Sequence, residues 1–292
     1  MKLDFMKYQY LYFLISAVFL LPCLYSLITW GLKPSIDFTG GTILELKTDQ
    51  VDLKSQQDKV NTVLESQLSS IQESGPSSYI LRLKQIDREQ KDKIITDLSQ
   101  QLGPVEEVRF ETVGPTIGQE LIRKTIMAVI IAAGFILFYV AYRFKEKRYG
   151  VCAILAMFHD SLILLGIYSL LGHFFGVEID TLFVTAVLTI LSFSVHDTVV
   201  VYDRIRESVR LYPRADYYSL VNKAVAETLT RSVNNSMTII FMLLTLYLLG
   251  GETTKWFVFA LLIGTISGTY SSTFTAAPLL VLWDKVANKT KK

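Results

Sequence analysis

Six apolar runs dominate this sequence, and each is long enough to cross a lipid bilayer as a helix. They are residues 10–30, 126–142, 149–171, 182–202, 233–249 and 256–283. Only helices and closed barrels satisfy their backbone hydrogen bonds inside a membrane, and about 20 apolar residues make one helical span. Of the 292 residues, 19% are charged, and the charges collect between the runs. The sequence therefore predicts a polytopic α-helical membrane protein with six transmembrane helices.

The distribution of lysine and arginine predicts how these spans are oriented. Basic residues cluster before the first span, between the second and third, between the fourth and fifth, and after the sixth. Under the positive-inside rule, both termini lie in the cytoplasm. The first run has no small-residue cleavage site, so we expect a retained anchor rather than a signal peptide. The expected parts are residues 1–31 with the first span, an extracytoplasmic domain at 32–123, five spans at 124–284 and a cytoplasmic tail at 285–292.

The segment between the first two spans is long enough to fold as a small domain. Alternating apolar residues predict strands at 41–47, 78–84 and 105–113. Apolar residues at helical spacing predict two intervening helices, one through Val60, Val63, Leu64, Leu68 and Ile71 and one through Ile94, Ile95, Leu98 and Leu102. Asp87 and Gln90 match a capping box at the start of the second helix. We expect a βαβαβ, ferredoxin-like α+β domain with its helices on one face of the sheet.

This domain contains no histidine or cysteine, so we expect no metal-binding or hydrolytic centre in it. Its surface is expected to be merely solvated, or to dock an extended polypeptide or a partner subunit. Asp37, Gly40 and Gly41 stand where the first span leaves the membrane, and the paired glycines predict a tight turn there. The two cysteines of the chain lie in apolar runs, where they are expected to be inert, and nothing indicates nucleic-acid binding.

Asp197 lies inside the fourth run, roughly 9 Å from its cytoplasmic end at 1.5 Å per residue. An ionised carboxylate there costs about 2.5–3.5 kcal/mol on insertion scales, so a partner is expected. Arg231 begins the fifth run on the same side of the membrane, at similar depth. Polar side chains around these two residues predict a hydrated pocket; they are Ser194, Thr198, Ser232, Asn234, Asn235, Ser236 and Thr238.

Two interpretations of Asp197 and Arg231 stay open at this point. A static ion pair would hold the two helices together. Alternatively, burial favours the neutral acid and a guanidinium favours the ionised acid, so Asp197 would gain and lose a proton as Arg231 moves.

Three further motifs stand out in or near the spans. His159 and Asp160 form a second intramembrane polar pair, either as a buried hydrogen-bonded pair or as part of a proton relay. Gly264 and Gly268 provide a small-residue face for close helix packing. A charged continuation of the fourth span is expected to meet lipid headgroups or a cytoplasmic partner; it comprises Asp203, Arg204, Arg206 and Glu207.

The motifs together resemble the SecD/SecF family of bacterial protein-export membrane proteins, and within it the SecF type. They are I-D-F-T-G-G after the first span, E-T-V-G-P-T-I-G-Q-E-L before the second, H-D in the third, S-V-H-D-T-V-V-V-Y-D-R-I-R-E in the fourth and T-L-T-R-S at the fifth. The family belongs to the resistance–nodulation–division type of membrane protein, and the resemblance runs nearly end to end.

This resemblance implies a function. SecF-type chains pair with SecD in the bacterial inner membrane, beside the SecYEG channel and the SecA ATPase. They use the proton-motive force to complete the translocation of unfolded polypeptides, with protons as the coupling ion and without cofactor, metal or enzymatic activity. The resemblance assigns proton conduction to Asp197 and Arg231.

One residue departs from the family pattern, because His196 replaces the asparagine that usually precedes the aspartate. A protonated His196 would favour the ionised form of Asp197, whereas a neutral imidazole would replace the amide as a hydrogen-bonding group, and we favour the second interpretation. An alternative function is a proton-driven exporter of small molecules or lipids from the same superfamily, although such chains normally carry about twice as many spans. An intramembrane aspartyl protease is disfavoured because no G-x-G-D motif is present.

Overall fold

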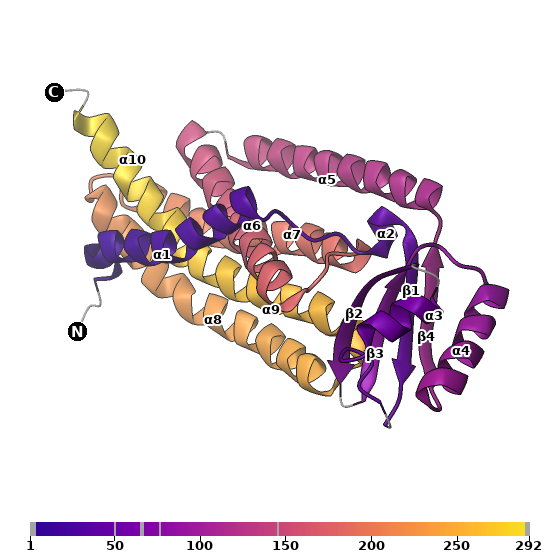
Figure 1. The fold of residues 1–292 in the computed structure, drawn as a ribbon. Coiled ribbons are helices and arrows are strands. Elements are labelled where there is room, and N and C mark those ends of the chain that lie inside the picture. The colour runs from indigo at the N-terminus through magenta and orange to yellow at the C-terminus, as the bar shows by residue number, and fades with distance from the viewer. Residues whose placement is uncertain (1–3, 50, 65–66, 76, 145, 290–292) are drawn as a thin grey trace. The chain divides into compact units, whose positions relative to one another are not determined.

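A computed structural model describes residues 4–49, 51–64, 67–75, 77–144 and 146–289. The chain divides into two compact units (Figure 1). A helical unit comprises the residues up to Lys33 and from Met127 onward, and an α+β unit comprises Pro34–Ile126. Of the basic residues that predicted the orientation, Lys2, Lys145, Lys291 and Lys292 lie outside the described residues.

Six helices in the described part of the chain are long and apolar enough to cross a membrane, which confirms the predicted number of spans. Most extend beyond the apolar runs, because polar residues continue the helix past the hydrocarbon at one or both ends. The sixth span, Thr253–Ala287, contains more than one element. The elements are η1 Phe5–Tyr8, α1 Gln9–Thr29, α5 Pro115–Arg143, α6 Lys147–Phe175, α7 Thr181–Leu211, α8 Tyr217–Leu249, α9 Glu252–Ser271, the π-helix η2 Ser272–Ala276 and α10 Ala277–Lys289.

Burial separates the inner helices of the helical unit from the outer ones. Half of the apolar window of α6 and of α7 is buried, and 56% of that of the sixth span, against 6% for α5 and 17% for α1 and α8. The apolar residues of the outer helices remain exposed, as expected where lipid covers them. The inner helices are therefore the place where polar side chains can be sequestered from lipid.

Two close crossings hold helices of this unit together, one between α1 and α6 and the other between α7 and α9. At Gly166 on α6, an added Cβ would lie 2.1 Å from the Cβ of Cys23 on α1, so only glycine permits this approach. The hydroxyl of Ser26 donates to Ser169 at 2.6 Å, and Ser169 donates to the backbone oxygen of Gly31 at 2.6 Å. On α9, an added Cβ at Gly264 would lie 2.3 Å from Ile190 of α7. The Gly264 and Gly268 face is thus packed against α7.

The α+β unit is a four-stranded antiparallel sheet with strand order β2-β3-β1-β4. Its elements are the short helix α2 Ile36–Thr39, β1 Gly41–Lys47, α3 Gln57–Val63, β2 Leu68–Gly75, β3 Ser78–Leu83, α4 Arg88–Leu102 and β4 Glu106–Val113. Leu44 and Leu46 of β1 alternate inward and pack with Leu81 of β3 and with Val60 and Leu98 of the helices. This βαββαβ order is the ferredoxin-like arrangement and confirms the predicted fold class.

The prediction for this unit was one strand short. Leu68 and Ile71, expected to continue the first helix, lie in β2, which forms a hairpin with β3. The helix ends at Val63, and the hydrogen bonds of β3 favour the extended conformation beyond it. Between β2 and β3, Pro76 lies outside the described residues, and Ser77 has φ +59°.

Two local predictions in the α+β unit can be compared directly with the structure. Asp87 and Gln90 exchange side-chain and backbone hydrogen bonds, which confirms the capping box of α4. Asp37 lies in α2, whose Ser35 cap accepts a hydrogen bond from the Asp37 backbone. The chain then turns sharply, with φ of +72° at Gly40 and +123° at Gly41, before β1 begins.

Candidate functional site

Asp197 lies in the middle of α7 with its side chain turned into the helical unit, where it is only 6% exposed. Ser232 of α8 donates a hydrogen bond to its Oδ1 at 2.9 Å. Ser272, the first residue of η2, donates a short hydrogen bond to its Oδ2. Among the described residues, no ion pair involves Asp197. Residues of three helical elements therefore meet at this buried carboxylate, and two of them donate hydroxyl hydrogen bonds to it.

Asp160 on α6 forms a second buried carboxylate site and is 1% exposed. Its Oδ1 accepts from Ser267 at 2.7 Å and lies 3.0 Å from Nδ1 of His159. Its Oδ2 accepts from Ser194 at 2.6 Å and from Ser271 at 2.5 Å. Asp160 and Asp197 thus receive hydrogen bonds from consecutive serines, Ser271 and Ser272.

The predicted ion pair between Asp197 and Arg231 is not formed. Arg231 is exposed, and no ion pair in the described part of the chain joins it to Asp197. Consecutive helical residues point about 100° apart, so when Ser232 faces Asp197 its neighbour Arg231 faces outward. The role that the resemblance assigns to Arg231 therefore cannot act through direct contact with Asp197 in this arrangement.

The polar residues expected around Asp197 fall into two groups. Ser194 serves Asp160 instead of Asp197, and Thr198 is buried with no hydrogen-bond partner for its hydroxyl. His196, Asn234 and Asn235 are exposed on the outer surface of the helical unit. Of the polar residues predicted around Asp197, Ser232 contacts it directly, and the outward-facing ones lie at the surface of the helical unit.

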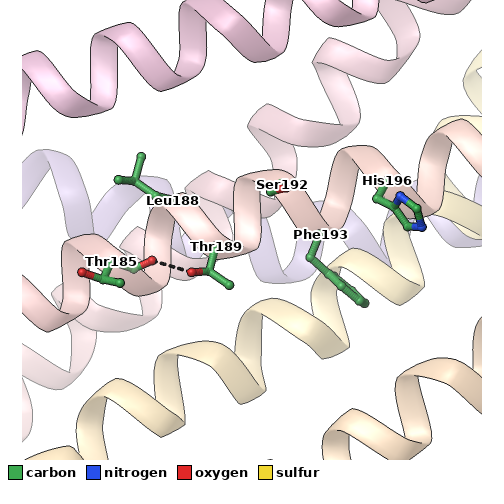
Figure 2. Close-up of a pocket in the computed structure, with 6 residues that line it drawn as sticks. All are labelled: Thr185, Leu188, Thr189, Ser192, Phe193 and His196. Carbon is green, nitrogen blue, oxygen red and sulfur yellow. Dashed lines mark hydrogen bonds between the residues drawn. The ribbon is translucent and has the colours of Figure 1, made fainter.

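That surface includes an open pocket of about 600 Å³ along α7 (Figure 2). Leu188 and Phe193 contribute apolar side chains to it. The other lining residues are polar and follow one another along the helix: Thr185, Thr189, Ser192 and His196. His196 stands at the end of this row farthest from Thr185 in the view of Figure 2. These four polar side chains of α7 are exposed, and so are Arg231, Asn234 and Asn235 of α8; the term outer polar face denotes these seven exposed residues.

The charged end of α7 forms ion pairs with its neighbours. Arg204 donates to Glu227 of α8 at 2.6 Å and to Glu207 at 2.6 Å. Asp203 pairs with Arg143 of α5 and with Arg206 of its own helix. These contacts join α5, α7 and α8 at one end of the helical unit.

Sequence reasoning did not identify Ser267, Ser271 and Ser272 as hydrogen-bond donors to the two acids. A signal was present, because Gly264, Ser267, Gly268 and Ser271 follow one face of a helix at spacings of three and four. In the described residues, no group of three or more His, Cys, Asp or Glu side chains is placed to hold a metal ion.

Comparisons with known proteins agree on one family. The family model described as protein export membrane protein SecD/SecF, C-terminal, matches residues 94–286, and the SecD/SecF GG motif matches residues 25–50. Protein translocase subunit SecF of Thermobaculum terrenum is 42% identical, covering 97% of this chain and 94% of its own. The corresponding subunit of Anaerolinea thermophila is 38% identical over the same shares of the two chains.

A solved structure gives the same result for the fold. The crystal structure of SecDF, a translocon-associated membrane protein from Thermus thermophilus, matches with a TM-score of 0.84 and 32% identity. The match covers 98% of this chain but 39% of that longer chain.

Proposed function

The chain belongs to the SecD/SecF family of protein-export membrane proteins, and we propose that it uses the proton-motive force to complete the translocation of polypeptides across the cytoplasmic membrane of a bacterium. It is an accessory subunit of a protein translocase, with a transport role rather than an enzymatic one. In the proposed cycle, Asp197 takes up a proton from one side of the membrane and releases it to the other. The change in its charge alters how α7 packs against α8 and η2.

The observation that carries this proposal is the environment of Asp197. An ionised carboxylate has about four acceptor positions, and two hydroxyl groups occupy only part of them here. No cation pairs with it in the described residues, and burying an unpaired charge costs free energy. A residue in that condition suits reversible proton binding better than a permanent structural charge.

The available energy is sufficient for such a switch. Moving one proton through 100 mV yields about 2.3 kcal/mol, and each unit of pH difference adds about 1.4 kcal/mol. A hydrogen bond to a charged group contributes about 1.5–3 kcal/mol. One proton can therefore change whether Ser232 and Ser272 hold the carboxylate, and with it the contact between three helices.

A SecD-like membrane subunit is the partner we propose for the outer polar face. Charged and strongly polar side chains within spans almost always face protein or water rather than lipid. Arg231 and His196 are exposed in this chain alone, so a second set of spans is needed to cover them. We propose that Arg231 and His196 take part in proton conduction at that covered face, and that protons reach Asp197 from it.

The α+β unit is proposed to lie outside the cytoplasm, with both termini of the chain inside, and to contact the emerging unfolded polypeptide. SecA and the SecYEG channel would act on the same polypeptide at the preceding stage. The support is the sheet topology, because β2 and β4 are the edge strands of the described sheet. An extended chain adds readily to such an edge through backbone hydrogen bonds. A proton-driven exporter of small molecules or lipids is disfavoured, because the relatives matched over nearly their full length are protein translocase subunits.

The test is Asp197→Asn, measured with the SecD-like partner in membrane vesicles. We expect proton flux and late-stage secretion to fall to background while the complex still assembles. Asp180→Asn is the matched control, because Asp180 caps the same helix by accepting from Phe183 at 2.7 Å and asparagine caps equally well. Normal flux in Asp197→Asn vesicles would reject the proposed function.

A further inference from the structure

Asp160 accepts hydrogen bonds from three serine hydroxyls and lies beside the ring of a histidine. Ser194, Ser267 and Ser271 donate to it at 2.5–2.7 Å, and the ring of His159 provides a fourth contact at 3.0 Å. These contacts fill the four acceptor positions of an ionised carboxylate. Bonds of this length are typical of charge-assisted hydrogen bonds. The site therefore replaces water around a negative charge in the middle of the helical unit.

His159 is the group that can balance this charge. The neighbouring helices present hydroxyl groups to Asp160, Ser194 from α7 and Ser267 and Ser271 from α9, and no Lys or Arg forms an ion pair with it among the described residues. His159 is 7% exposed, and its Nε2 is buried without a hydrogen-bond partner. One added proton converts the negatively charged pair into an imidazolium cation beside a carboxylate anion, and this pair is neutral as a whole.

Ser271 and Ser272 connect this pair to Asp197. Ser271 donates to Asp160 and Ser272 donates to Asp197, although the two serines are adjacent in the chain. Because adjacent helical residues point about 100° apart, one segment wedged between α6 and α7 can reach both. The segment is the junction between the end of α9 and the start of the π-helix η2. Short π-helical turns within α-helices are frequent at functional sites.

Each serine also has a second acceptor within reach. The hydroxyl of Ser271 lies 3.3 Å from the backbone oxygen of Gly268, and that of Ser272 lies 3.1 Å from the backbone oxygen of Thr269. When a carboxyl becomes protonated, its serine can turn its own O–H to the backbone and accept the new proton on its lone pair. Each of these two serines can thus hydrogen-bond to its acid in both protonation states.

We infer that the His159–Asp160 pair is a second proton-binding site, coupled to Asp197 through the junction of α9 and η2 that carries Ser271 and Ser272. The inference rests on the proposed role of Asp197 and adds a second buried acid to it. When a proton binds at the pair, an O–H bond forms on the Asp160 carboxyl or an N–H bond forms on the His159 ring; when the proton leaves, that bond breaks and the pair regains its negative charge.

The first measurement is proton flux in proteoliposomes that contain the full chain and its SecD-like partner. We expect Asp160→Asn to lower the flux at least tenfold and Ser271→Ala to lower it several-fold, with recovery in Ser271→Thr, which keeps the hydroxyl. Ser161→Ala is the control: it removes a half-buried serine hydroxyl of α6 that donates to the backbone oxygen of Met157 at 2.9 Å, and it should leave the flux unchanged. Co-purification with the partner reports folding of each variant.

The second measurement is infrared difference spectroscopy between high and low pH, in the same proteoliposomes. A carboxyl band should remain in Asp197→Asn, and the histidine ring bands should lose their pH response in Asp160→Asn. Wild-type flux in both Asp160→Asn and Ser271→Ala, with flux abolished in Asp197→Asn, would overturn this inference and leave the proposed function intact. Wild-type flux in Asp197→Asn would instead overturn the proposed function.

Discussion

Gly264→Ala tests how α9 is seated on α7, and hence how its serines reach Asp160. A methyl group at residue 264 would lie 2.3 Å from Cγ1 of Ile190 and 2.6 Å from its Cγ2 and Cδ1. Ordinary contacts begin at 3.4 Å, so the helices would have to separate by about 1 Å. Ile190 is 3% exposed, and rotating its β-branched side chain replaces one clashing carbon with another.

The expected cost follows from this geometry. Adding a methyl group to a close-packed site lowers the free energy of unfolding by about 1–3 kcal/mol. The same displacement would stretch the bonds from Ser267 and Ser271 to Asp160, now 2.7 and 2.5 Å, toward the limit for a hydrogen bond. We therefore expect Gly264→Ala to lower both the free energy of unfolding and the proton flux.

The assay is unfolding of the purified protein by SDS in mixed micelles, followed by circular dichroism, within a double-mutant cycle. Ile190→Ala removes all three clashing carbons and by itself costs about 2–5 kcal/mol through the cavity it leaves. In the double variant the new methyl group fills part of that cavity. The double variant should therefore lose at least about 1 kcal/mol less free energy of unfolding than the two single variants lose together.

Two glycines provide controls for this cycle. An added Cβ at Gly268 meets Phe193 at 3.2 Å, which a small adjustment relieves, and at Gly134 it meets nothing within 4 Å. Both alanine variants should be close to wild type in stability. Fully additive losses in the cycle, or a Gly264→Ala variant as stable as Gly134→Ala, would refute the close-packing account.

Two further predictions concern the α+β unit. Gly40→Ala should destabilise this unit by about 1–3 kcal/mol, because the residue has φ +72° and an added Cβ would lie 2.9 Å from Cα of Pro115. Its thermal unfolding midpoint in the full-length protein measures this loss, and Gly75→Ala, with open space around its Cβ, is the control. Asp87→Ala should cost about 1 kcal/mol by removing the cap of α4. Hydrogen exchange should then become faster in the first turn of that helix, and unchanged protection there would contradict the capping role.

The spans were predictable because a lipid environment leaves few choices. Each long apolar run must form a helix to satisfy its own backbone, so hydropathy alone identified six of them. The missed strand shows the limit of periodicity. Leu68 and Ile71 continue the spacing of a helix, yet β3 offers them a hydrogen-bonded partner that local sequence does not reveal.

The acids of the site were predictable, but their partners were not. Asp160 and Asp197 are conspicuous because carboxylates are rare within spans. Their contacts depend on the rotation of each helix about its axis, which composition does not determine. One residue of difference, about 100°, decides that Ser232 meets Asp197 and that Arg231 does not.

The crossing of α1 and α6 has a mechanical consequence. The backbone connects the helical unit to the α+β unit twice, once after α1 and once through α5. α1 is locked to α6 by the contact of Cys23 with Gly166 and by the hydroxyl chain from Ser26 through Ser169 to Gly31, whereas α5 is barely buried. Any displacement of α6, the helix that carries Asp160, therefore also displaces α1.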